Sequence, residues 1–295
     1  MRSRPKRLGR VAWKLGALAA LVAAPGVGVA DTKQFHDAAE AVPGHPGLTY
    51  LDLIRRAVPD LAKNAADDRF EGHLATTPRH IAGPEYQGDP PDVVTVGLVE
   101  DQRIKIGGKP RIALLVDLGP KPDRVEGLAL LMLLDDAPRP RLLDDADVGI
   151  DQDSVFAERA VLPLGGGDDA LVTYSEDDDA DLTMGGYVLI SPIGDRLRMV
   201  QLFDIASIEA CGWSNIERAK FSTSPDPGRA YRRIEVQASA RFRRTDPSCG
   251  PRDVPKAHSA VFSATYRWNA AARRFETRSD IAARLKAFNN LVFGG

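Results

Sequence analysis

The sequence predicts a mainly β fold in which antiparallel three-stranded meander units are repeated about three times, with short packing helices near both ends. Three observations support this prediction. Apolar and polar residues alternate with a period of two, turn-forming residues separate these stretches, and the same order of strands, loops and turns recurs along the chain. Such a repeat fits either a β-sandwich or a small propeller-like arrangement, and both remain open at this stage.

The three predicted units span about residues 107–150, 165–207 and 228–279. The first unit reads as the strand RIALLVDLG, the loop PKPDRVEG, the strand LALLMLLDD, the turn APRP and the strand RLLDDADVG. The turn formers GGKP, GGGD and SPDPG precede the three units. The short turn before each third strand requires antiparallel pairing, because a parallel strand needs a crossover of about a dozen residues or more. An extra hairpin is predicted before the first unit, with the strands VVTVGLV and RIKI around the turn EDQ.

The burial of individual strands follows from the same pattern. Every second residue from Ile234 to Phe242 is apolar, and the residues between them are polar. This alternation is typical of an antiparallel strand that buries one face only. The stretch LALLMLLDD, which begins at Leu128, is apolar on both faces and predicts a central strand that is covered on two sides.

Helices are predicted at both ends of the β region. The stretch TYLDLIRRAV starts at Thr49, which we expect to cap the helix, and places Ile54 and Val58 on one side. The stretch SDIAARLKAFNN near the C-terminus has a similar apolar side. We expect both helices to cover a sheet face or an open sheet edge.

Residues 1–30 are predicted to be a signal peptide. A basic start, MRSRPKRLGR, precedes an apolar run from Leu15 to Ala30 that ends with small residues at Gly28 and Ala30. This run is shorter than the span of about 20 apolar residues that crosses a membrane. We therefore expect a periplasmic or secreted protein with no transmembrane segment after the signal is removed. The remainder is predicted to form a lead-in with an N-terminal helix over 31–66 and a single β-rich domain over 67–295.

One disulfide bond is predicted between Cys211 and Cys249, the two cysteines of the sequence. An even number of cysteines in an exported chain favours oxidation, whereas two free buried thiols are the alternative. The bond would tie the second unit to the third. Trp213 lies beside Cys211 and is predicted to pack on the disulfide or, if exposed, to form the rim of a binding site.

Charge is distributed unevenly along the chain. Without residues 1–30, 33 Lys and Arg stand against 41 Asp and Glu, a net charge of about −8. Residues 117–181 contain 18 acidic and 5 basic residues, whereas residues 217–286 contain 7 acidic and 16 basic ones. The basic C-terminal half therefore suggests an anionic envelope polymer as a partner, and we expect no nucleic acid. The alternative is that the two halves complement each other within the fold.

The segment SEDDDADLTMGG is a candidate calcium site. Asp177, Asp179 and Asp181 have the alternating spacing of carboxylates in calcium-binding loops. However, Leu182 stands where the sharp turn of such a loop requires glycine, and the twelfth position holds Val188 rather than Glu. A solvated acidic loop between two strands is therefore favoured over a calcium site, and no other cofactor is expected. A second acidic cluster, DDADVGIDQD, is also interpreted as solvated.

Catalytic motifs are absent from the sequence. It contains no G-x-S-x-G, H-E-x-x-H or C-x-x-C motif and no phosphate-binding loop. His73 and His80, with Glu71 and Glu85 nearby, could ligate a metal or act as an acid and base, but surface or capping roles are favoured. The sequence thus indicates an exported protein of binding or envelope-associated type rather than an enzyme. The alternative is an exported hydrolase that acts on envelope polymer or glycan with paired carboxylates.

Overall fold

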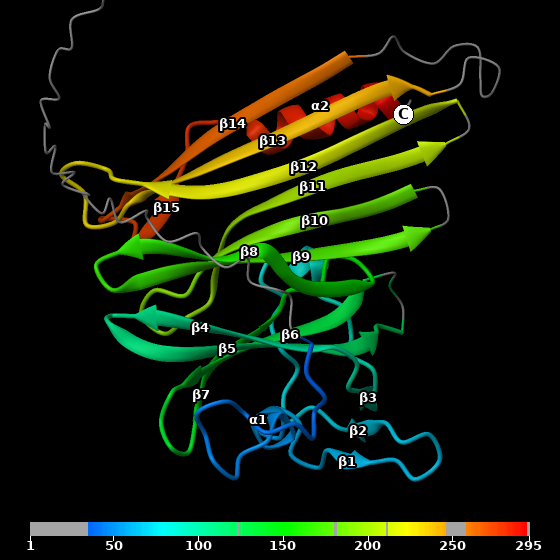
Figure 1. The fold of residues 1–295 in the computed structure, drawn as a ribbon, viewed down its shortest axis with the longest axis vertical. Coiled ribbons are helices and arrows are strands. Elements are labelled where there is room, and N and C mark those ends of the chain that lie inside the picture. Colours follow the sequence, from blue (N-terminus) through cyan, green and yellow to red (C-terminus); the bar gives the residue numbers. More distant parts are fainter. Residues whose placement is uncertain are drawn as a thin grey trace, which may run out of the picture. The chain divides into compact units, whose positions relative to one another are not determined.

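The strands of the protein form three antiparallel sheets (Figure 1). The computed structural model describes residues 35–122, 124, 126–179, 182–210, 212–245 and 258–293. The first sheet has three short strands, β1 (Ala62–Lys63), β2 (Phe70–Gly72) and β3 (Val94–Thr95). The second sheet has four, β4 (Val99–Ile106), β5 (Lys109–Pro120), β6 (Gly127–Asp135) and β7 (Leu142–Asp147).

The third sheet has eight strands, and each pairs with its neighbour in sequence. They are β8 (Asp153–Gly165), β9 (Asp168–Asp179), β10 (Leu182–Ser191), β11 (Arg198–Ala210), β12 (Trp213–Ser224), β13 (Arg233–Arg244), β14 (His258–Asn269) and β15 (Arg274–Glu276). The helices are α1 (Tyr50–Ile54), a 3-10 turn at Pro84–Tyr86 and α2 (Ile281–Phe293). The chain is therefore mainly β, with α-helices at both ends of the β region, as predicted.

The three predicted meander units are present. They correspond to β5-β6-β7, β9-β10-β11 and β13-β14-β15, all antiparallel. The second and third units belong to one continuous sheet, because β12 pairs with both β11 and β13. Of the two arrangements that the pattern left open, the sandwich-like one is found.

The sequence-based elements differ from the structure in several places. Strands β8 and β12 were not predicted, and the EDQ segment is no turn, since Glu100 lies inside β4 and pairs with Leu115. The acidic segment is not a long loop either. Asp177 pairs with Met184 and Asp179 pairs with Leu182, so the β9–β10 hairpin extends through it. The main-chain ladder does not depend on the type of side chain, which is why an acidic run can extend a hairpin.

Two sheets pack face to face in the middle of the protein. Leu115 and Leu131 of the four-stranded sheet belong to the same buried cluster as Leu171 and Ile190 of the eight-stranded sheet. Strand β6 is buried along its whole length, which confirms the prediction of a strand covered on both sides. Burying this much apolar surface is the main source of stability for such an arrangement.

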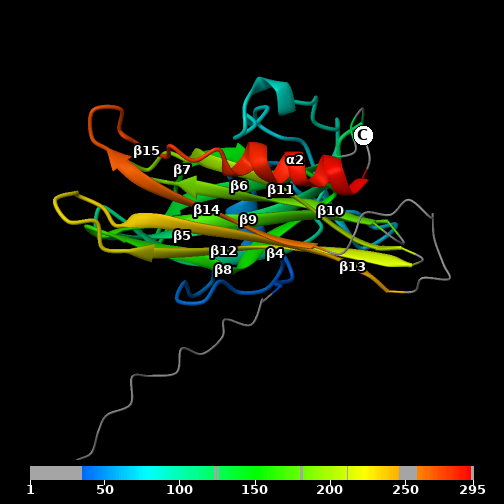
Figure 2. The ribbon, with the colours of Figure 1, turned by 90° about the horizontal axis from the view of Figure 1, so that it is seen from above.

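The helices cover the outer faces. Helix α1 packs Leu53 and Ile54 against the face of β5 and β6 that points away from the eight-stranded sheet. Its N-terminus has the predicted cap: Asp52 N–H donates to Thr49 Oγ1, and Thr49 N–H donates to Asp52 Oδ2. Helix α2 covers the apolar face of β12–β14 with Ile281 and Leu285, and Figure 2 shows it on one side of these strands.

Residues 1–34, which include the predicted signal peptide, lie outside the described residues. From Phe35 on, the predicted lead-in is packed against the rest of the protein, and Ala38 and Val42 are buried beside α1. Neither α-helix in the described part of the chain has the length and apolar character required to span a bilayer.

Candidate functional site

The histidines and glutamates that the sequence singled out do not meet. His73 is exposed, and its Nδ1 lies 2.6 Å from Asp60 Oδ2. Hydrogen bonds from the backbone and side chain of His73 lower the pKa of the Asp60 carboxyl. Glu71 instead accepts a hydrogen bond from Asn64, and His80 is buried elsewhere. These residues therefore form no common acid–base or metal site.

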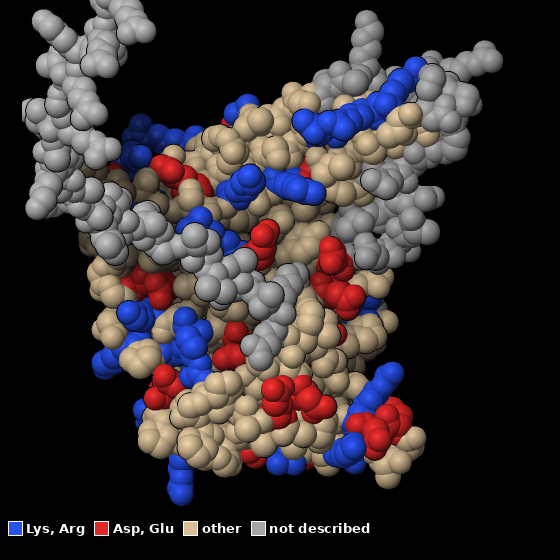
Figure 3. Space-filling model, viewed as in Figure 1, with Lys and Arg blue, Asp and Glu red and all other residues tan. Residues whose placement is uncertain are grey.

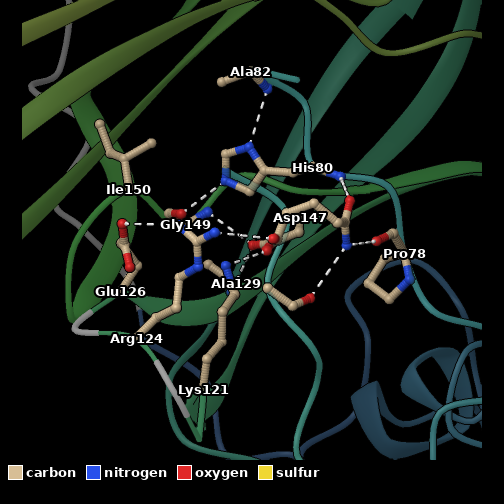
Figure 4. A network of polar contacts seen from close by, with 12 residues as sticks. Pro78, His80, Ala82, Lys121, Arg124, Glu126, Ala129, Asp147, Gly149 and Ile150 are labelled. Atoms are coloured by element: carbon tan, nitrogen blue, oxygen red, sulfur yellow. Dashed lines mark hydrogen bonds and ion pairs between the residues drawn. The ribbon is translucent and has the colours of Figure 1, made fainter. Parts of the chain in front are cut away.

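His80 is part of a buried polar network (Figure 4). The Ala82 N–H donates to its Nδ1 at 3.1 Å, so Nε2 carries the proton and donates to the Gly149 carbonyl at 2.9 Å. Burial lowers the pKa of His80, although the charge of Asp147 acts in the opposite direction. Both ring nitrogens are thus engaged with the backbone, and His80 holds residues 80–82 against the end of β7.

A buried ion pair lies in the same network. Lys121 Nζ is 2.6 Å from Asp147 Oδ2, and both side chains are about 1% exposed. Asp147 Oδ1 also accepts hydrogen bonds from the backbone N–H groups of Ala129 and Gly149. The interpretation of this acidic cluster as solvated is therefore wrong for Asp147, whose charge is compensated inside the protein. Because the His80 ring nitrogens bind the backbone and the charges of Lys121 and Asp147 face each other, we interpret the network as structural.

A second histidine pair docks the N-terminal segment. His36 Nε2 lies 3.0 Å from Asp101 Oδ1, and His45 Nε2 lies 2.7 Å from Asp136 Oδ1. Arg103 sits between the two carboxylates, 3.5 Å from Asp101 and 2.7 Å from Asp136. The network joins residues 36–45 to β4 and to the turn after β6.

A hollow of about 600 Å³ lies beside His45, Arg103 and Asp136. A histidine oriented by an aspartate is the arrangement of a general base in nucleophilic catalysis. The remaining residues that line this hollow are Pro43, Gly44, Pro46 and Pro138, so the described wall has no hydroxyl or thiol nucleophile. The hollow therefore lacks the partner that this chemistry requires.

Neither the hollow beside His45 nor a second hollow at the end of β14 brings together the paired carboxylates that a glycan hydrolase would need. Among the described residues, the hollow beside His45 has Asp136 as its one carboxylate, and the hollow at the end of β14 has Glu276. Glu217 is buried under α2, and this burial raises the pKa of its carboxyl. Its oxygens accept hydrogen bonds from Ala206 N–H and the Asn215 amide. No group of residues suited to hold a metal ion is found in the described part.

The outward face of β12 and β13 has a different character. Arg218 and Lys220 on β12 and Arg241 and Arg243 on β13 are exposed and project from the face opposite α2. We call these four residues the basic face. The register places Arg218 opposite Ser239, and Lys220 opposite Gln237. Each cation thus faces a neutral residue across the ladder, which avoids direct repulsion between like charges.

The cations of the basic face have no ion-pair partner among the described residues. Figure 3 shows Lys and Arg gathered over the strands β12–β14 in the upper part of the view. The acidic side chain of Glu235 is already paired with Arg233 at 2.8 Å. Two exposed apolar residues, Ile216 (37% exposed) and Val261 (59% exposed), lie on the same face. The result is an exposed sheet face whose four cations have no ion-pair partner among the described residues, with polar and apolar groups between them.

The remaining sequence-based candidates have mixed outcomes. Trp213 starts β12, is partly buried and packs on Phe242 with ring centroids 5.4 Å apart. Cys211, Cys249 and Asp181 lie outside the described residues, as do the side chains of Asp177 and Asp179. The disulfide bond and the calcium site therefore stay predictions.

Comparison with known protein families, curated proteins and solved structures finds no match to this chain.

Proposed function

We propose that this is an exported binding protein of the cell envelope, which holds an anionic polymer against its basic face. The single observation that supports this proposal is the set of four exposed cations on β12 and β13 that have no carboxylate partner among the described residues. A protein of net charge about −8 after loss of residues 1–30 would otherwise be expected to neutralise such a cluster.

The geometry of the basic face suits an extended ligand. Alternate residues on one strand are about 6.6 Å apart, so Arg218 and Lys220, or Arg241 and Arg243, present charges at a regular spacing. An open sheet face gives a polymer room to lie along or across the strands. A small ligand would instead need a concave site that surrounds it.

The proposal of export is supported by residues 1–30, whose basic start and short apolar run have the order of a signal peptide. Catalysis is not part of the proposal. The His45–Asp136 pair has no nucleophile on the described wall of its hollow, and neither hollow holds two carboxylates.

Binding of a uronic acid polymer, polygalacturonate, tests the proposal by calorimetry. The variant R241E/R243E should bind at least about tenfold more weakly, a loss of about 1.4 kcal/mol, because it replaces two attractive contacts by repulsive ones. The matched control is R139E/R196E, which changes the net charge equally at two exposed arginines outside the basic face. Equal weakening in both variants would contradict the proposal, since it would mean that only net charge matters. Neutral dextran should not bind.

A further inference from the structure

A hollow of about 510 Å³ lies at one end of the outward face of β14. Its polar wall consists of Arg229, Thr265, Arg267, Asn269, Glu276, Thr277 and Arg278. Three arginines and one carboxylate give this wall a net positive charge. The volume is in the range of pockets that bind small molecules and is about large enough for one or two sugar rings.

The hollow forms where the last strand of the sheet is short. Strand β15 pairs only with the end of β14, through Arg267 with Glu276 and Trp268 with Phe275. Arg229, from the connection between β12 and β13, supplies the third side. The β14–β15 hairpin and Arg229, which lies 39 positions before Trp268, thus line one concave surface, as expected of a binding site.

Two of the arginines are held in place by the protein. Arg267 Nη1 donates to Asp226 Oδ1 at 2.5 Å, and Arg229 Nη1 donates to the Trp268 carbonyl at 3.0 Å. Each guanidinium keeps further N–H donors that no described group accepts. Arg278 is exposed and has no hydrogen bond or ion pair with any described residue. Held guanidinium groups with spare donors match a planar carboxylate, which arginine can bind through two parallel hydrogen bonds.

The rest of the wall offers groups that bind hydroxyls. Glu276 accepts hydrogen bonds from Asn269 at 2.7 Å and from Arg274 at 2.7 Å, and these bonds lower the pKa of its carboxyl. An ionised Glu276 accepts hydrogen bonds from hydroxyl groups but repels a compact anion such as phosphate. Thr265 adds a hydroxyl that both donates and accepts. The wall therefore combines donors for one acid group with acceptors for neighbouring hydroxyls.

We infer that this hollow binds an acidic sugar residue, with the sugar carboxylate at Arg278, Arg267 and Arg229 and its hydroxyls near Glu276 and Thr265. The inference rests on the proposed function, because it identifies the anionic polymer of the basic face as an acidic glycan. The hollow and the basic face are connected along β14. Ser259, which pairs with Arg241, and Arg267 in the hollow lie on the same face of this strand, about 26 Å apart.

The test uses galacturonate, galactose and inorganic phosphate as separate probes in calorimetric titrations of the full chain. Galacturonate should bind, and R278A should weaken its affinity about tenfold or more, as expected for the loss of a charged hydrogen-bond donor. R196A is the matched control and should leave the affinity unchanged. Arg278 is exposed and has no hydrogen bond or ion pair with a described residue, so its replacement should not disturb folding, which the melting temperature of R278A checks directly.

The outcomes separate this inference from the proposed function. Galactose or phosphate binding as tightly as galacturonate would overturn the inference, and so would an R278A variant with unchanged galacturonate affinity. The variant R241E/R243E should bind the monomer as the wild type does. If galacturonate binds but polymer affinity is the same in R241E/R243E and the wild type, the inference about the hollow holds and the proposal for the basic face is wrong. If R241E/R243E weakens polymer binding but galacturonate does not bind, only the inference about the hollow is wrong.

Discussion

Two cations at the four-stranded sheet, Arg111 and Lys121, and the four cations of the basic face are the same residue types in opposite circumstances. Arg111 on β5 forms two hydrogen bonds to Asp195 at 2.7 and 2.9 Å, and Lys121 is buried against Asp147. Arg218 and Arg241 on the eight-stranded sheet are exposed and have no such partner among the described residues.

The difference shows how one chain uses its charge for two purposes. In the first region Arg111 and Lys121 join segments that are far apart in sequence. Arg111 connects β5 to the turn before β11, and Lys121 connects the loop after β5 to β7. In the second region the four cations of the basic face form no ion pair with any described residue. Positive charge with a fixed internal partner contributes to folding, whereas positive charge without one is available to a ligand.

The largest expected effect comes from breaking the buried pair. Asp147→Asn should lower the free energy of unfolding by about 3–5 kcal/mol, because it leaves the Lys121 ammonium buried without a counter-charge. Urea denaturation measures the loss. Asp68→Asn is the control, since Asp68 pairs with Lys63 on the surface with 85% of its side chain exposed. A surface pair of this kind contributes only about 0–1 kcal/mol. Similar losses in both variants would mean that Asp147 is solvated after all.

The binding of the polymer should depend strongly on salt. Raising the ionic strength from about 0.01 to 1 M shortens the screening length from about 30 to 3 Å, so exposed cations lose most of their attraction for a polyanion. Wild-type affinity for polygalacturonate should fall steeply over this range, and that of R241E/R243E should change much less. Calorimetric titrations at several salt concentrations give the dependence of affinity on salt for both proteins. The same dependence in both would mean that the polymer does not contact Arg241 and Arg243.

Acid should weaken the network around His80. Its pKa is lowered in the folded protein by burial, so the unfolded chain takes up a proton first as the pH falls. The stability that neutral His80 provides is therefore fully present above the unfolded pKa of about 6.5 and is lost as the pH falls below it. The variant H80N, which keeps an acceptor for the Ala82 N–H, should lose less stability than the wild type between pH 7.5 and 5. Identical profiles would show that His80 does not titrate differently on folding.

The smallest effect is expected on the basic face. R241S/R243S should change the free energy of unfolding by less than about 0.5 kcal/mol, because both side chains are exposed and unpaired. The same urea titration that reveals the loss in Asp147→Asn provides the comparison. A loss above about 1.5 kcal/mol would show that these arginines stabilise the fold, and the contrast between the two regions would disappear.

Much of the fold follows from local pattern. The alternation from Ile234 to Phe242 predicts β13 with the correct face buried, and the apolar run from Leu128 predicts the central strand β6. Strand β8 was not predicted because its register with β9 shifts between Phe156 and Val161, which interrupts the alternation of apolar and polar residues. Strand β12 was not predicted because Asn215 and Glu217 point inward and form hydrogen bonds with Ala206 of the neighbouring strand β11, a contact that no local pattern reveals.

The candidate site was predictable only in outline. The excess of basic residues after Glu217 indicated where an anionic partner would bind, but it did not show which cations would remain unpaired. That distinction depends on tertiary contacts: Arg267 meets Asp226 across 41 positions of sequence, whereas Arg241 meets no carboxylate among the described residues. The hollow at the end of β14 depends on where β15 begins and ends, which short strands without strong alternation do not reveal.

Amide NMR of the isotope-labelled protein during titration with an oligogalacturonate long enough to span about 26 Å tests the central claim most directly. The account predicts that the shifted signals cluster on β12, β13 and β14 and in the hollow around Arg278, with those near His45 and Asp136 unchanged. Shifts confined to the hollow beside His45, or spread evenly over all exposed lysines and arginines, would contradict it.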